Sequence, residues 1–125
     1  MAKLEKFEDM DIWQDAITLA KDVYAVTRNG DFARDFGLAN QLQRSAVSVS
    51  SNIAEGFERN NTGEFMYFLR VAKASCGEVR TQLVIAHSIG YTTKDAHTSL
   101  YTQAVSISKR ISGYIRYLKE RKTKT

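Results

Sequence analysis

The residues best suited to bind a ligand are basic side chains near the C-terminus. Seven occur from residue 109 onward: Lys109, Arg110, Arg116, Lys119, Arg121, Lys122 and Lys124. Glu120 is the single acidic residue in this stretch, so the stretch carries a net charge of +6 and the preceding residues carry −2. Clustered lysines and arginines bind nucleic-acid phosphates. The pattern is compatible with nucleic-acid binding, but for a single subunit the charges alone favour a solubilising helix C-terminus, whose basic residues suit the helix dipole.

Aromatic residues lie among these charges. Tyr114 and Tyr117 have rings on which unpaired bases stack in single-strand binding proteins. For Tyr114 the plainer interpretation is core packing, because it falls on a predicted apolar row.

A second pattern is a stripe of mostly short polar side chains, spaced by three and four residues: Gln41, Arg44, Ser48, Asn52 and Glu55. At 100° per residue these side chains fall within about 80° of one another on a helix. The stripe is compatible with a solvated face, a subunit interface or internal hydrogen-bond network, or a ligand site. We favour the interface or network, because short side chains lose little rotamer entropy when they pair.

Candidates for metal binding and catalysis are weaker. His87, His97 and Asp95 flank one predicted turn, but a metal site needs three or four ligands in a fixed geometry. Neither Glu55 nor Glu78 precedes a histidine by three residues, as a di-iron bundle requires. There is no Gly-x-Ser-x-Gly elbow and no phosphate-binding glycine loop. We therefore expect no metal, no cofactor, no catalytic residues and no enzyme activity.

The composition sets further limits. The chain has 125 residues, which is the size of one domain, and it contains no proline and one cysteine. A chain of this length would average about six prolines, so nothing here forces a helix to break. The single cysteine excludes a disulfide framework. No apolar run reaches the ~20 residues of a membrane span, and the N-terminus lacks an apolar signal region. These features predict a cytoplasmic protein without a membrane partner.

Apolar residues recur at helical spacing in four blocks, which predicts four helices. The first has an apolar row and ends in a turn over residues 28–35 that contains Asn29-Gly30-Asp31. That row is Met10, Trp13, Ile17, Ala20, Tyr24 and Thr27. The second helix covers about residues 36–59, and its many small residues allow close helix packing. Its apolar row is Leu38, Leu42, Ala46, Val49, Ile53 and Phe57.

The third and fourth helices show heptad rows, the pattern of a helix bundle. Asn61 and Glu64 have the spacing of a cap at the start of the third helix, and Gly90 stops that helix. The rows in the third helix are Phe65, Ala72, Val79 and Ala86, with Leu69, Cys76, Leu83 and Gly90. Cys76 on this seam is expected to be a buried, inert thiol. Thr92 or Thr93 caps the fourth helix, whose rows are His97, Ala104, Ile111 and Leu118, with Leu100, Ile107 and Tyr114.

Short connections between long helices require neighbouring helices to run antiparallel. The prediction is an all-α, up-down-up-down antiparallel four-helix bundle over residues 1–119. Residues 120–125 are predicted to be a basic, irregular C-terminal tail.

Several stretches resemble a known family. They are Ile12-Trp13-Gln14-Asp15-Ala16, the segment 36–49 that begins Phe36-Gly37-Leu38-Ala39-Asn40-Gln41-Leu42, and Ser51-Asn52-Ile53-Ala54-Glu55-Gly56-Phe57. The third helix adds Phe65, Phe68-Leu69, Ala72, Ser75, Glu78 and Leu83. The chain is similar over about residues 7–118 to the four-helix bundle proteins known as 23S ribosomal RNA intervening-sequence proteins. Accessory variability proteins of diversity-generating retroelements belong to the same group.

The resemblance implies a small bacterial cytoplasmic bundle that assembles as a homo-oligomer, with a homopentamer expected. It also implies a basic scaffold that binds RNA or DNA. The alternative is a protein-interaction module that docks a partner such as a reverse transcriptase without binding nucleic acid itself. One departure from the family is that Gly30-Asp31-Phe32 stands where relatives usually carry a Phe-Pro pair.

Overall fold

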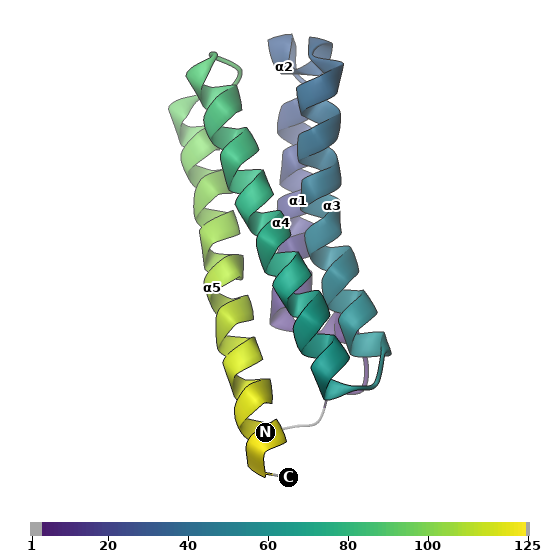
Figure 1. Cartoon of the computed structure of the whole chain (residues 1–125). Helices are drawn as coiled ribbons and strands as arrows, with labels where there is room; N and C mark the ends of the chain where they lie inside the picture. The colour runs from purple at the N-terminus through teal and green to yellow at the C-terminus, as the bar shows by residue number, and fades with distance from the viewer. Residues whose placement is uncertain (1–3, 125) are drawn as a thin grey trace.

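The computed structural model describes the backbone of residues 4–124 and the side chains of residues 4–122. Four long helices dominate the described part of the chain, together with one short α-helix and one 3-10 turn. In chain order the elements are η1 (Phe7–Asp9), α1 (Asp11–Thr27), α2 (Gly30–Arg34), α3 (Phe36–Glu58), α4 (Thr62–Ser88) and α5 (Lys94–Lys124). Consecutive long helices run in opposite directions (Figure 1). The predicted bundle is therefore confirmed.

The four long helices form a closed square. α3 packs on α4, α4 on α5, α5 on α1 and α1 on α3. The predicted heptad rows supply the core: in α4 every predicted row residue up to Ala86 is buried, as are Ala104, Ile107 and Ile111 in α5. Within residues 4–124 no helix is long and apolar enough to cross a membrane.

The helix ends follow local hydrogen bonding. The Asn61 side chain accepts a 2.9 Å hydrogen bond from the Glu64 N–H at the start of α4, as predicted. At its end Gly90 has φ +87°, and the Tyr91 N–H donates to the Ala86 carbonyl at 2.9 Å. This is the glycine-based helix stop in which the chain turns back on itself. Of the two predicted caps for α5, Thr93 is the one used, since it accepts from the Ala96 N–H at 3.1 Å.

In the apolar row predicted for α1, Met10 and Thr27 are buried as expected, but the residues between them are wrong by one position. The residues that are buried along α1 are Ile12, Ala16, Leu19, Val23 and Thr27. Trp13, Ile17, Ala20 and Tyr24 are half-buried beside them. Two apolar rows lie next to each other on this helix. The buried row contains the branched residues Ile12, Leu19 and Val23 together with the small Ala16. Tryptophan and tyrosine carry a polar group on an apolar ring, so they favour the edge of the core, where that group can reach water.

The connection between α1 and α3 also differs from the prediction. Instead of a simple turn it contains α2, on which Phe32 is completely buried. The Phe32 ring packs on Tyr91, with 5.1 Å between ring centroids. Asp35 then caps α3 by accepting from the Leu38 N–H at 3.1 Å, and its second oxygen accepts from the Tyr91 hydroxyl at 2.9 Å. This hydrogen bond raises the pKa of Tyr91.

The C-terminal segment is helical where a tail was predicted. α5 continues to Lys124, so the bundle helix includes most of residues 120–125. Arg121 is one turn after Tyr117 and donates to its hydroxyl at 3.2 Å. Pairs at this spacing stabilise a helix, and basic residues suit its C-terminal end. Residues 1–3 and 125, which belong to the predicted bundle and tail segments, lie outside the described residues.

The four sides of the square are not equally tight. Between α3 and α4, a Cβ added at Gly56 would lie 2.9 Å from Phe65 Cδ1 and 2.9 Å from Phe68 Cβ. The α1–α5 side is looser, with three hollows of about 340, 380 and 330 Å³ along it. Polar contacts cross this side: an ion pair joins Arg110 to Asp15, and Gln103 Nε2 donates to Asp22 at 3.1 Å.

We predict that Gly56→Ala lowers the free energy of unfolding by about 1–3 kcal/mol, because the new methyl group overpacks the α3–α4 contact. The matched control is Gly113→Ala on α5, where an added Cβ meets nothing within 4 Å. This control should gain up to about 1 kcal/mol from the better helix propensity of alanine. Urea unfolding measures both. A Gly56→Ala variant as stable as the parent would contradict the close α3–α4 approach.

We also predict that Cys76 reacts slowly with a thiol reagent in the folded chain. Burial raises the pKa of its thiol from 9.0 to about 11, although Lys73 and Arg80 lower it in part. The folded protein then holds about 100-fold less thiolate than the unfolded chain at pH 8, and the side chain is completely buried. Labelling with a chromogenic disulfide, with and without denaturant, should differ by at least that factor. Equal rates would show that the α4 seam is open.

Candidate nucleic-acid interface

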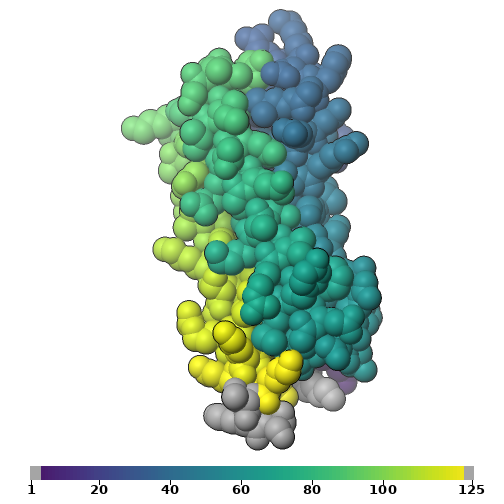
Figure 2. Space-filling model, viewed as in Figure 1, coloured from purple at the N-terminus to yellow at the C-terminus, as the bar shows by residue number. Residues whose placement is uncertain are grey.

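The register between α4 and α5 decides which basic residues share a surface. The Arg80 guanidinium carbon lies 5.5 Å from the centroid of the Tyr101 ring. At the other end of the pair, a Cβ on Gly63 would lie 3.4 Å from Lys122 Nζ. Because the helices are antiparallel, these two contacts place Lys73 close to the level of Lys109. The seam between the two helices faces the viewer in Figure 2.

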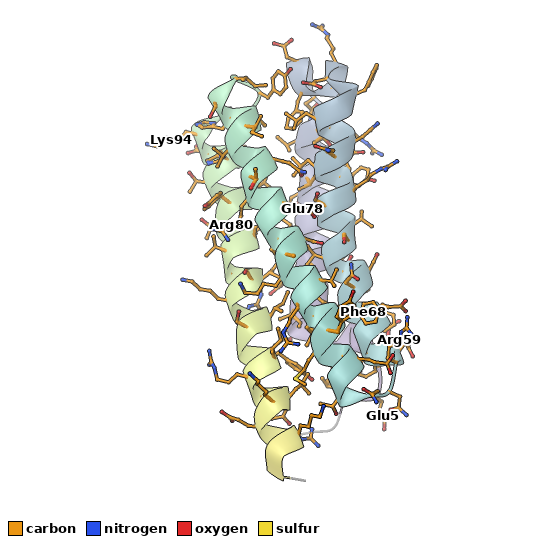
Figure 3. All side chains as sticks on the ribbon, viewed as in Figure 1. Glu5, Arg59, Phe68, Glu78, Arg80 and Lys94 are labelled. Atoms are coloured by element: carbon orange, nitrogen blue, oxygen red, sulfur yellow. The ribbon has the colours of Figure 1, made fainter. Side chains whose placement is uncertain are left out.

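Two helical stripes border this seam and carry basic side chains. On α5 the stripe runs through Tyr101, Val105, Lys109, Ser112, Arg116 and Lys119, and on α4 it runs through Arg70, Lys73, Gly77, Arg80 and Val84. The spacing of three and four residues keeps each stripe on one side of its helix. We call the six basic residues the α4–α5 basic face: Arg70, Lys73, Arg80, Lys109, Arg116 and Lys119. All are exposed except Arg80, which is half-buried and lies on the α5 side of α4 in Figure 3.

The structure separates Arg110 from this face. Its guanidinium pairs with Asp15 across the α1–α5 side of the bundle, and the Nε of Arg110 is buried without a hydrogen-bond partner among the described residues. Arg110 therefore serves the contact between α1 and α5, although its neighbour Lys109 is on the basic face.

The last basic residues lie on the final turns of α5. Arg121 contacts the Tyr117 ring, at 5.5 Å from its centroid, and Lys122 reaches toward the start of α4. The side chain of Lys124 lies outside the described residues. Tyr114 packs on Phe65 at 5.6 Å between ring centroids, and desolvation by burial raises its pKa. Its ring thus belongs to the edge of the core, which is the plainer of the two interpretations given above.

Sequence reasoning missed three members of the basic face. Arg70, Lys73 and Arg80 are spread over α4, where Glu64 and Glu78 reduce the net charge to +1, so the charge excess is too small to single them out. One signal was present: Lys73 and Arg80 are seven residues apart and therefore lie on the same side of a bundle helix. That side could be identified only once α5 was placed beside α4.

The polar stripe of α3 divides into two parts. Ser48 and Asn52 form a network with α4, in which Ser48 Oγ lies 2.9 Å from Ser75 Oγ and Asn52 Nδ2 donates to Ser48 Oγ at 2.9 Å. Ser75 is buried on α4. The network joins α3 and α4 at a point where both helices present small side chains.

The remaining stripe residues, Gln41, Arg44 and Glu55, are exposed. Glu55 accepts from Arg59 at 3.3 Å, and the Arg59 guanidinium also lies 4.9 Å from the centroid of Phe68. Figure 3 shows Arg59 and Phe68 near the end of the bundle where α3 turns into α4. The outer surface of α3 and α4 is therefore built from short polar, aromatic and paired charged groups.

The histidines lie together at the opposite end of α4. The His87 and His97 rings stack at 4.5 Å between centroids and 18° between planes. His87 Nδ1 lies 3.0 Å from Thr92 Oγ1, whereas His97 Nδ1 is buried without a partner in the described chain. Within that part of the chain, no group of three or more His, Cys, Asp or Glu residues is arranged to hold a metal ion.

Comparison with solved structures supports the fold. A crystal structure of a protein of unknown function, from the S23 ribosomal protein family of Bacteroides thetaiotaomicron, superposes with a TM-score of 0.77. The two sequences are 20% identical, and the match covers 83% of this chain and 97% of that one. At this identity the similarity concerns the fold alone. No curated protein matches the sequence closely enough to support an assignment.

The sequence itself carries a family signature. The protein-family model described as 23S rRNA-intervening sequence protein matches residues 8–113. This range extends from η1 into α5 and includes all of α1, α3 and α4. The match covers most of the bundle, and the chain therefore belongs to the family of 23S rRNA-intervening sequence proteins.

Proposed function

We propose that the chain is a non-enzymatic, homo-oligomeric scaffold that binds nucleic acid through the α4–α5 basic face. The observation that carries this proposal is that six basic residues fall, by helix spacing, on the stripes of α4 and α5 that contain the contact pair Arg80 and Tyr101. Charge on a rigid helical surface attracts a polyanion without any group entering a groove. Binding of this kind is largely independent of sequence and depends on salt. The family description, which refers to 23S rRNA, favours RNA among the polyanions.

Self-association is the second part of the proposal, and its surface is the α3–α4 face. We define this face by Gln41, Arg44, Ser51, Glu55, Tyr67 and Ala74, all of them exposed. Tyr67 is a large side chain that is 59% exposed, and its ring meets that of Phe68 in a T-shaped contact at 5.1 Å between centroids. Tyrosine and arginine are residue types enriched at protein interfaces, and the small Ser51 and Ala74 leave room for a partner to approach Tyr67. A ring, expected to be a pentamer by family resemblance, would repeat the basic face in every subunit.

On α4 the two faces lie next to each other: Tyr67 and Ala74 are on the outer surface, and Arg80 lies toward α5, where it covers Tyr101. One helix can therefore contact a neighbouring subunit with one edge and nucleic acid with the other. Assembly would multiply phosphate contacts on a single particle, which increases avidity without a change in any one contact.

We predict that neutralising the basic face reduces the salt dependence of binding. The variant is Lys73→Gln, Lys109→Gln and Arg116→Gln, and the slope of log K against log salt should fall by about one unit for each phosphate that the variant no longer neutralises. The measurement is a titration of structured RNA, single-stranded DNA and duplex DNA at several salt concentrations. A control of equal charge change is Lys6→Gln, Lys21→Gln and Arg34→Gln, on exposed residues before and within α1 and α2.

The control should retain nearly the parent slope, because none of those residues is on α4 or α5. If both triple variants reduce the slope equally, binding depends on total charge and the basic face is not the contact. If the parent protein binds none of the three ligands at ~50–100 mM salt, the nucleic-acid proposal is wrong.

We predict that the parent protein is an oligomer at about 10 µM and that Tyr67→Lys shifts it toward the monomer, since a buried charge without a partner is costly at an interface. Light scattering gives the molar mass. The control is Phe36→Lys: Phe36 is 74% exposed and begins α3, and it lies outside the defined face. A monomeric parent, or equal dissociation of the two variants, would exclude the α3–α4 contact.

The alternative is a module that docks a partner protein such as a reverse transcriptase. The exposed Tyr67 and the polar side chains around it on the α3–α4 face would also suit a foreign protein. It predicts no nucleic-acid binding at ~50–100 mM salt and a specific partner recovered in pull-down experiments, so the titration above separates the two functions.

A further inference from the structure

Four planar groups form a column along the seam between α4 and α5. The rings of His87 and His97 stack at 4.5 Å, and the His97 ring lies 5.6 Å from that of Tyr101 at 34°. The guanidinium of Arg80 then covers Tyr101 at 5.5 Å. Two groups come from α4 and two from α5, so the packing of the helices holds the column in place.

The column ends at a hollow on the surface. This hollow has a volume of about 500 Å³, and its lining consists of Gly77, Arg80, Thr81, Val84, Ile85 and Tyr101. Gly77 opens it further, since a Cβ added there would meet nothing within 4 Å. Val84 and Ile85 are each 46% exposed, so the floor is apolar. A volume of this size is within the range of small-molecule sites.

Arg80 gives the hollow a polar group in addition to its apolar floor. Its Nε is buried and has no hydrogen-bond partner among the described residues. A guanidinium stacked on tyrosine is planar, positively charged and rich in donors. It can both stack on a second planar group and donate hydrogen bonds to that group or to a phosphate.

The hollow also lies between basic residues. Lys73 precedes Gly77 by one turn on α4, and Lys109 follows Tyr101 by about two turns on α5. Because the helices are antiparallel, both lysines lie toward the same end of the bundle from the hollow. Both are exposed. A ligand that places a planar apolar group in the hollow would therefore carry its negative charges toward the rest of the α4–α5 basic face.

We propose that the hollow seats one unpaired nucleobase, stacked on the outer face of the Arg80 guanidinium that ends the column, while Lys73 and Lys109 contact the neighbouring phosphates. This inference rests on the proposed nucleic-acid function and names the form of ligand: a strand with an exposed base. The bases of a duplex are already stacked and paired, so a duplex would contact only the basic residues. Stacking on aromatic and arginine side chains tolerates any base, which agrees with binding that is independent of sequence.

The test compares two strands of about 20 nucleotides, one with bases and one abasic, so that their phosphates are equal and only stacking differs. The parent protein should bind the base-containing strand at least about tenfold more tightly than the abasic strand. Gly77→Leu fills the hollow and should bring this ratio close to one, with little change in binding to the abasic strand or to a duplex. The control is Gly113→Leu, at a half-buried glycine of α5 with free space around it, which should keep the parent ratio.

A second variant tests the hollow without adding a bulky leucine to the surface. Arg80→Lys keeps the charge and removes the planar group, so it should also lower the ratio by about fivefold or more. Circular dichroism confirms that each variant is helical. If the parent binds both strands equally, or if Gly77→Leu leaves its preference intact, no base enters the hollow, although the basic face still binds phosphates. If the parent binds neither strand nor duplex, the proposed function and this inference fall together.

Discussion

The close contact between α3 and α4 is the constraint on which the rest of the bundle depends. Gly56 has no room for a side chain beside Phe65 and Phe68, and Ser48 and Ser75 meet through their hydroxyl groups. A contact this short fixes the rotation of α4 about its own axis. Once that rotation is set, Lys73 and Arg80 turn toward α5 and Tyr67 turns outward. The placement of both candidate surfaces thus follows from small residues in α3.

The hydrogen bond between Ser48 and Ser75 has a second effect. Ser75 is buried on α4, and an error in register that left its hydroxyl without a partner would cost about 1–3 kcal/mol. Helices that meet only through leucine and alanine can shift in register more easily, because apolar contacts are not directional. The network therefore specifies the alignment of α3 with α4, while the heptad rows supply most of the burial.

Much of this fold could be predicted from the sequence. Asn61 and Gly90 mark the ends of α4 by local chemistry, and the apolar rows of α3 identify a helix in spite of its serines. The row of α1 could not be chosen correctly, because Ile12 and Trp13 start two adjacent apolar rows and only packing decides between them. α2 was missed for a similar reason, since five residues become a helix there through the burial of Phe32 beneath Tyr91, which is distant in sequence.

The candidate site was predictable only in part. Counting charges along the chain finds Lys109, Arg116 and Lys119, because they are close in sequence. It also includes Arg110, whose side chain turns to α1, and it omits Arg70 and Lys73. Whether a charged residue joins a surface depends on the rotation of its helix about its own axis and on the register between that helix and its neighbour. A short stretch of sequence determines neither of them.

The looser α1–α5 side has a consequence for how the bundle moves. The contacts α1–α3, α3–α4 and α4–α5 join elements that follow one another along the chain, whereas α1–α5 joins its two ends. This last side contains the three hollows and is bridged by polar groups that water can replace. Local opening follows the path of lowest free energy, so thermal fluctuations should part α1 from α5 first. The three remaining helices would stay together as a layer, with the basic face intact, while α1 exchanges between closed and open positions.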